Sequence, residues 1–187
     1  MDLFKDPEPF RLKLSFILRM PPKAHKETQF TRTGIAYTDP GKEAWMIEAA
    51  EQLRKYEGWF KHSYFLSLKV VFHCERPTKR PQESRLPVDS WFDYGVELMK
   101  RSAPDLDNYE KSLQDVLSRH VIRRKQLDKH KIRVIRPEIR GAGIIEDDSL
   151  IVTKTSHKIY AKRGTKPRIE ITIRERGHLY LRKKKKK

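Results

Sequence analysis

Residues 105–117 read DLDNYEKSLQDVL, and this stretch decides the fold class of the chain. A helix advances by about 100° per residue, so the apolar residues of this stretch fall within one arc. They are Tyr109, Leu113, Val116 and Leu117. Polar residues between Asp107 and Ser118 occupy the opposite arc. We therefore predict an amphipathic helix from Asp107 to about His120 that packs its apolar face against a core.

Segments on both sides of this helix have the patterns of β-strands. Residues 10–19 alternate between apolar and polar side chains, which predicts a half-buried strand that ends at Pro21-Pro22. Residues 63–74 are rich in β-branched and aromatic side chains, which are typical of strands. Further strands are expected over residues 150–160 and 168–174.

Two further helices are expected. Residues 42–56 have an amphipathic pattern, with apolar contacts from Trp45, Ile47, Ala49, Ala50 and Leu53. A short helix is expected over residues 91–100, after a proline-containing loop. Strands that flank helices predict an α+β (mixed α/β) fold, in which a small mixed sheet of about four strands packs with two main helices.

The charge of the chain is positive and unevenly spread. Its 187 residues include 42 Lys and Arg against 25 Asp and Glu, a formal net charge of +17. Residues 119–140 hold nine Lys and Arg and two acids, and residues 176–187 hold seven and none. The rest is nearly balanced, which predicts a folded body with basic attachments. A field of this sign attracts polyanions, so nucleic acid is the expected partner.

Composition disfavours several other classes of protein. A single cysteine, Cys74, excludes an intramolecular disulfide, and His and Cys do not cluster at zinc-ligand spacing. No apolar run approaches the roughly 18 residues that span a membrane, and the first residues have no apolar signal region. We expect an intracellular, cytoplasmic protein with no membrane contact and no small-molecule organic cofactor.

Two carboxylates, Asp105 and Asp107, stand two residues apart where the predicted helix begins, and Lys111 follows one helical turn later. In an extended chain both carboxylates lie on one side, and on a helix Lys111 stands beside Asp107. Such carboxylates bind a hard cation such as Mg²⁺, and the lysine can meet charge that develops on a phosphate. The structural alternative is a capping box, with Asp107 as N-cap and Glu110 three residues on, beside an exposed Asp107–Lys111 pair.

A second acidic block, Glu146-Asp147-Asp148, lies between the apolar pair Ile144-Ile145 and a predicted strand. Adjacent acids are unfavourable unless they are solvated or hold a cation, and in a polyanion-binding chain they would repel the ligand. A bound Mg²⁺ removes this conflict by bridging carboxylate and phosphate. The alternative is an acidic turn.

Together these motifs resemble the RusA family of Holliday-junction resolvases, small nucleases often carried by phages and prophages. The similarity rests on Asp-Leu-Asp-Asn at residues 105–108, on Lys111, and on the glycine-containing segment that leads to Asp147-Asp148. It covers about residues 10–175. It implies a RusA-like, homodimeric nuclease that acts on four-way or other branched DNA with Mg²⁺, or with Mn²⁺ as a substitute, in the cytoplasm of a bacterial or phage-infected cell.

The resemblance also implies roles for individual residues. By position, Asp105, Asp107 and Asp148 would be catalytic metal ligands, Asp147 a further candidate ligand, and Lys111 the catalytic lysine. The implied function is a Mg²⁺-dependent endodeoxyribonuclease of recombination and repair, which resolves Holliday junctions by metal-activated hydrolysis of phosphodiester bonds.

The basic segment at about residues 119–140 departs from the family, which has a short turn here. We interpret it as an insertion, either a DNA clamp or a solvated loop, within a nuclease domain of residues 1–175 that is followed by a basic, disordered tail of residues 176–187. The alternative function is a non-catalytic basic DNA-binding protein, which predicts Mg²⁺-insensitive binding to junction or duplex and no cut products. A nuclease of the Pro-Asp…Glu-x-Lys type is disfavoured because no Glu-x-Lys strand follows Pro104-Asp105.

Overall fold

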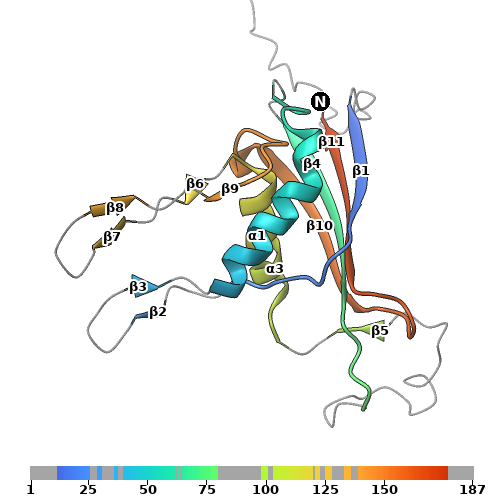
Figure 1. Ribbon diagram of the computed structural model, residues 1–187. Coiled ribbons are helices and arrows are strands. Elements are labelled where there is room, and N and C mark those ends of the chain that lie inside the picture. The colour runs from blue at the N-terminus through green and yellow to red at the C-terminus, as the bar shows by residue number, and fades with distance from the viewer. Residues whose placement is uncertain are drawn as a thin grey trace, which may run out of the picture.

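One mixed sheet lies against two helices in the computed structural model (Figure 1). The structure describes residues 12–25, 29–30, 36–37, 40–61, 63, 65–79, 98–100, 103–119, 121–122, 125–127, 133–135 and 139–176. The predicted α+β class, with a small mixed sheet and two main helices, is confirmed.

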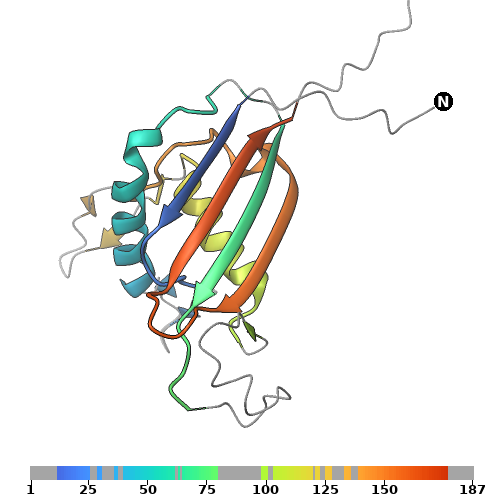
Figure 2. The ribbon, with the colours of Figure 1, turned by 90° about the vertical axis from the view of Figure 1, so that its right-hand side faces the viewer.

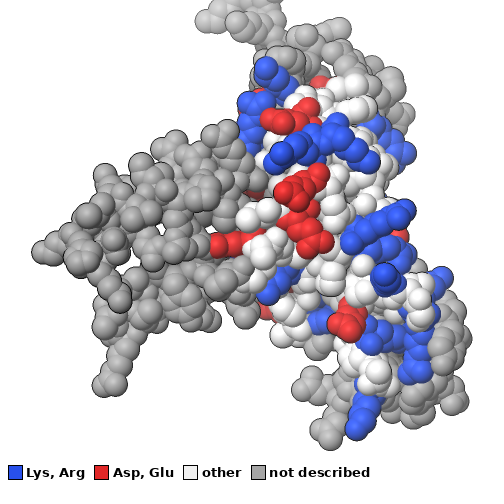
Figure 3. Space-filling model, in the orientation of Figure 1, with Lys and Arg blue, Asp and Glu red and all other residues white. Residues whose placement is uncertain are grey.

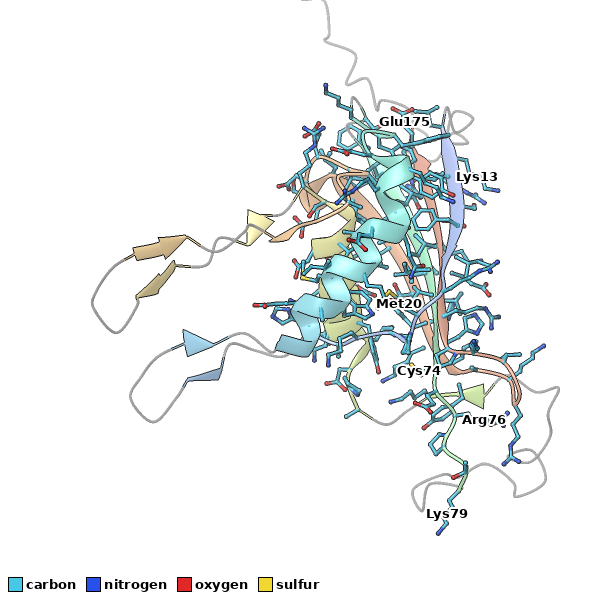
Figure 4. All side chains as sticks on the ribbon, viewed as in Figure 1. Lys13, Met20, Cys74, Arg76, Lys79 and Glu175 are labelled. Carbon is cyan, nitrogen blue, oxygen red and sulfur yellow. The ribbon has the colours of Figure 1, made fainter. Side chains whose placement is uncertain are left out.

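The sheet has the strand order β1-β11-β4-β10-β5. Its long strands are β1 (Lys13–Leu18), β4 (Leu66–Cys74), β10 (Ile151–Tyr160) and β11 (Arg168–Glu175). β10 runs parallel to β4, whereas β1 with β11 and β11 with β4 are antiparallel. Lys13 and Glu175 therefore mark one end of the sheet, and Cys74 lies toward the other (Figure 4).

The fifth strand, β5 (Leu98–Met99), corrects one prediction. The short helix expected over residues 91–100 is wrong at these two residues, which pair antiparallel with Tyr160 and Ile159 of β10. The outer edge of β10 offers unpaired backbone groups, and pairing with them outweighs local helix propensity. Residues 91–97 lie outside the described residues.

Both helices cover the same face of the sheet (Figures 1 and 2). α1 (Pro40–Leu53) continues into the 3₁₀ turn η1 (Arg54–Tyr56), close to the predicted range 42–56. Its buried stripe is Met46, Ala49, Ala50 and Leu53, together with Trp45. Ile47 is 46% exposed, so its expected core contact is wrong. It lies outside the i, i+3, i+4, i+7 spacing that Met46 begins.

The helix α3 (Leu106–Leu117) bears out the apolar arc read from the sequence, because Tyr109, Leu113, Val116 and Leu117 are all buried. The ring of Tyr109 stacks on Phe72 of β4, with 5.4 Å between the ring centroids. Two residues expected on the polar arc, Gln114 and Ser118, are also buried. The backbone of residues 142–145 bonds to this end of the helix, so its polar face does not lie open there.

The other strands are short and pair in two-stranded ladders. They are β2 (Gln29–Phe30) with β3 (Ala36–Tyr37), β6 (Val121–Ile122) with β9 (Ile139–Arg140), and β7 (Lys125–Leu127) with β8 (Arg133–Ile135). The last two ladders belong to the basic segment 119–140 and extend away from the body beyond the end of α3 (Figure 1). The predicted tail after Arg176 lies outside the described residues. Among the described residues, no helix has the length and apolar character that crossing a membrane requires.

Replacing Leu113 by alanine tests the buried face of α3. Leu113 is fully buried, so Leu113→Ala should lower the free energy of unfolding by about 2–5 kcal/mol, measured by urea denaturation. Ile47→Ala removes an exposed side chain from α1 and should change it by less than about 0.5 kcal/mol. Equal stability of the two variants would contradict this placement of α3.

Candidate active site at the two ends of α3

Asp105 and Asp107 lie at the start of α3, as predicted. The helix begins at Leu106, so Asp105 is its N-cap residue, with an extended backbone and no capping hydrogen bond from its side chain. Asp107 lies in the first turn and is exposed. The capping box considered from the sequence is not formed, because Asp107 is not the N-cap and Glu110 instead pairs with Lys154 of β10 at 3.3 Å.

Lys111 lies beside Asp107. Its Nζ is 3.4 Å from Oδ2 of Asp107, and the two side chains are 58% and 62% exposed. An exposed pair of this spacing stabilises a helix by only a few tenths of a kcal/mol, about 0.3–0.5. Breaking this pair so that either group can bind a ligand therefore costs little free energy.

Two lysines hold the turn that precedes Asp105. Nζ of Lys158, on β10, donates to the carbonyl oxygen of Pro104 at 2.7 Å, and Nζ of Lys100 donates to that of Ala103 at 2.6 Å. Burial lowers the pKa of Lys100, and the neighbouring Lys158 lowers it further against the opposing effect of Cys74. Cationic groups thus contact the two residues that precede Asp105.

The second acidic block follows a segment that caps the other end of α3. The amides of Ala142 and Gly143 donate to the carbonyls of Val116 and Ser118, and those of Ile144 and Ile145 both donate to Leu117. A helix leaves its last carbonyls without internal partners, and these bonds satisfy them. Gly141 permits the approach, because a Cβ there would lie 2.1 Å from the carbonyl oxygen of Ser118. Residues 146–148 come directly after this cap.

Asp147 and Asp148 have different surroundings. Asp147 is the N-cap of the 3₁₀ turn η2 (Asp148–Leu150), where its Oδ1 accepts a hydrogen bond from the amide of Ser149 at 2.8 Å. Hydrogen bonds from Ser149 hold the pKa of Asp147 below its usual value. Asp148 is exposed, and Glu146 faces Arg119 at 3.5 Å. Of the two aspartates, Asp147 has a clear structural task and Asp148 is the better candidate ligand.

The two acidic blocks do not form one cluster within the chain. α3 has 12 residues and is about 18 Å long, and the blocks lie at its opposite ends. The strand β10 also separates the two blocks. Lys158, near the end of β10, contacts Pro104 beside the first block, whereas Asp148 of the second block lies just before the start of β10. Within the described ranges, no three His, Cys, Asp or Glu side chains are grouped to hold a metal ion. On the face that Figure 3 shows, acidic side chains lie interspersed among Lys and Arg side chains.

Asp105 and Asp107 nevertheless have the chemistry of an open Mg²⁺ site. Mg²⁺ is usually held by one or two carboxylates and completes its octahedron with waters and phosphate oxygens of a substrate. Both carboxylates are exposed, and no capping bond occupies that of Asp105. The residues at the start of α3 therefore fit this ion as a pair, and Asp148 offers the same kind of oxygen at the other end.

The lysines around the site were missed by sequence reasoning. Lys154 and Lys158 of β10 align with Leu68 and Phe72 of β4, which face the core. Lys154 and Lys158 therefore lie on the helix-facing side of β10. Their alternate spacing in the strand could have predicted this from the sequence. A buried lysine of α1, Lys42, was also missed; its Nζ bonds to Asp115 of α3 at 2.9 Å and to His25.

Comparison with protein-family models matches residues 19–133 to the family described as endodeoxyribonuclease RusA. The match covers more than half of the chain and includes Asp105, Asp107 and Lys111, whereas Asp147 and Asp148 lie beyond it. The chain belongs to the RusA family of endodeoxyribonucleases. The resemblance read from the sequence is thereby confirmed. No curated protein matches the chain.

The cap on the end of α3 predicts that Gly141 cannot carry a side chain. In Gly141→Ala the new Cβ would meet the backbone carbonyl oxygens of Ser118, Asp115 and Val116, none of which can rotate away. We expect the free energy of unfolding to fall by about 1–3 kcal/mol or more, measured by thermal and urea unfolding. Unchanged stability would mean that residues 141–145 do not pack against α3 in this way.

Proposed function

We propose that this protein is a Mg²⁺-dependent endonuclease that cuts four-way and other branched DNA as a homodimer. Membership of the RusA family supports endonuclease activity, and the net charge of +17 supports a DNA partner. The observation that carries the proposal is the pair of exposed carboxylates at the start of a helix, Asp105 and Asp107, with Lys111 beside Asp107.

Each residue at this end of α3 has a separate task in the proposed reaction. Asp105 and Asp107 would hold the ion, which would supply activation of water and neutralisation of the phosphodiester charge. Lys111 turns from Asp107 toward the phosphate and meets the negative charge that develops in the transition state. The positive end of the α3 dipole favours the same anion, because amides at the start of a helix point outward.

The second acidic block enters the site from a second copy of the chain. Asp148 is separated from Asp105 and Asp107 by about the length of α3, roughly 18 Å, so one chain cannot place all three on one ion. In a two-fold dimer with antiparallel α3 helices, the end of one helix lies beside the start of the other. Two equivalent sites result, each with Asp105 and Asp107 from one chain and Asp148 from its partner. Two symmetric sites suit the two cuts that resolve a four-way junction.

Asp107→Asn tests the metal site. We expect cleavage of a synthetic four-way junction in Mg²⁺ to fall by about 100-fold or more, since the carboxylate that helps to hold the ion is lost. Junction binding in EDTA should be kept or strengthened, because a negative charge is removed. Glu51→Gln, an exposed position on α1, removes the same charge and should cleave like the wild type.

Parallel reactions with a linear duplex separate the alternatives. Paired nicks confined to the four-way junction support a resolvase, and cuts in both substrates point to a general nuclease of branched and duplex DNA. Mg²⁺-insensitive binding without products supports the alternative of a non-catalytic DNA-binding protein. Undiminished Mg²⁺-dependent cleavage by Asp107→Asn would overturn the assignment of this site.

Mixing two inactive variants tests the shared site. Asp107→Asn and Asp148→Asn should each be inactive alone, but a heterodimer of the two has one site with both native acids and one site with neither. After subunit exchange at equal concentrations, half of the dimers are mixed, so nicking should return to about a quarter of the wild-type rate. Because a mixed dimer has one active site, junctions nicked in one strand should outnumber junctions cut in two strands. A mixture no more active than its components would place each site within one chain.

A further inference from the structure

The turn before Asp105 is fixed from the side of the sheet by two ammonium groups on consecutive carbonyls. Lys158 donates to Pro104 at 2.7 Å and Lys100 to Ala103 at 2.6 Å. The lysines are themselves joined, because the amide of Lys100 donates to the carbonyl of Lys158 at 3.0 Å. The start of α3 is thereby tied to the edge of the sheet by one side chain from β10 and one from the residue that follows β5.

The position of Lys158 is unfavourable for the sheet itself. It is the neighbour of the buried Phe72 on the helix-facing side of β10, where an apolar residue would pack well. Lys158 is half-buried as a residue, and holding its long side chain in one conformation costs free energy. A short charge-assisted hydrogen bond offsets part of this cost, and it is made to the turn rather than to the sheet.

The choice of partner atoms matters for Asp105. Lys154, four residues earlier on the same face, binds the carboxylate of Glu110 directly. Lys158 and Lys100 bind instead the backbone carbonyls of the two residues that precede Asp105. These bonds therefore fix the backbone from which Asp105, the N-cap of α3, projects.

We propose that Lys158 and Lys100 are positioning residues, which clamp the Ala103–Pro104 turn so that the carboxylate of Asp105 stands beside that of Asp107 before Mg²⁺ binds. This inference rests on the proposed function, because it takes Asp105 and Asp107 as the metal ligands. Groups that orient the ligands of a metal typically raise its affinity by about 10- to 100-fold, since the site is then built before the ion arrives.

Lys158→Met tests the clamp, because methionine keeps an apolar stem beside Phe72 and removes only the ammonium. Without metal or DNA, the amide order parameters of residues 105–107, measured by ¹⁵N relaxation, should fall from about 0.85 to below about 0.6. The Mg²⁺ concentration for half-maximal junction cleavage should rise by about 10-fold or more. The Kd for the junction in EDTA should change by less than about 3-fold, because the substitution removes at most one contact with a DNA phosphate.

Two further variants distinguish a positioning role of Lys158 from an effect of its packing or of its charge alone. Lys158→Arg keeps a cationic donor and should restore most of the rigidity of residues 105–107 and the wild-type Mg²⁺ requirement. Lys154→Met removes the same charge from the same face of β10 and should leave the order parameters of residues 105–107 unchanged. If Lys158→Met does not fold, Lys100→Met carries the same comparison from the other donor.

The outcomes are separable from those of the metal-site test. The order parameters of residues 105–107 are measured without Mg²⁺, so they report on the clamp even if Asp107→Asn still cleaves. Unchanged order parameters in Lys158→Met would refute the clamp. Lower order parameters with an unchanged Mg²⁺ requirement would overturn its role in positioning Asp105.

Discussion

The contact between α3 and β4 is the constraint on which the candidate site depends. Leu113, Val116 and Leu117 are fully buried, and Tyr109 stacks on Phe72. Burial of four large apolar side chains contributes about 1.5–3 kcal/mol each before entropy is counted, which far exceeds the weak exposed pair of Asp107 and Lys111. The apolar face therefore decides where the helix lies, and the polar groups at its ends are carried to fixed places.

Both ends of α3 are then tied to other parts of the chain. At the start, lysines of the sheet edge hold Ala103 and Pro104. At the end, the amides of residues 142–145 take up the last carbonyls. Because the chain returns through Gly141 to the very end of the helix, the basic segment 119–140 leaves and re-enters at nearly one point. The entropic cost of closing a loop grows slowly with its length, so a long segment here is compatible with a fixed position of the second acidic block.

Much of this fold follows from periodicity, and the failures have physical causes. The buried arc of α3 and the four long strands are predicted because their patterns repeat over many residues. β5 was missed because two residues carry no pattern, and only the free edge of β10 makes them a strand. The N-cap was placed at Asp107 rather than Asp105 because periodicity does not define a helix boundary to within a residue or two. The contact of Lys158 with Pro104 was missed because it joins residues more than fifty positions apart in the sequence.

The separation of the two acidic blocks is a consequence of topology. β4 and β10 are parallel neighbours, and α3 lies in the connection between them. To join the end of one parallel strand to the start of the next, a helix must run back along the sheet, so its start lies near one end and its end near the other. Acids before such a helix and acids before the following strand are thus about one helix length apart, whatever their sequence. Asp148 of one chain can lie beside Asp105 and Asp107 of another if the α3 helices of the two chains are antiparallel. The proposed three-acid site therefore requires the proposed two-fold dimer.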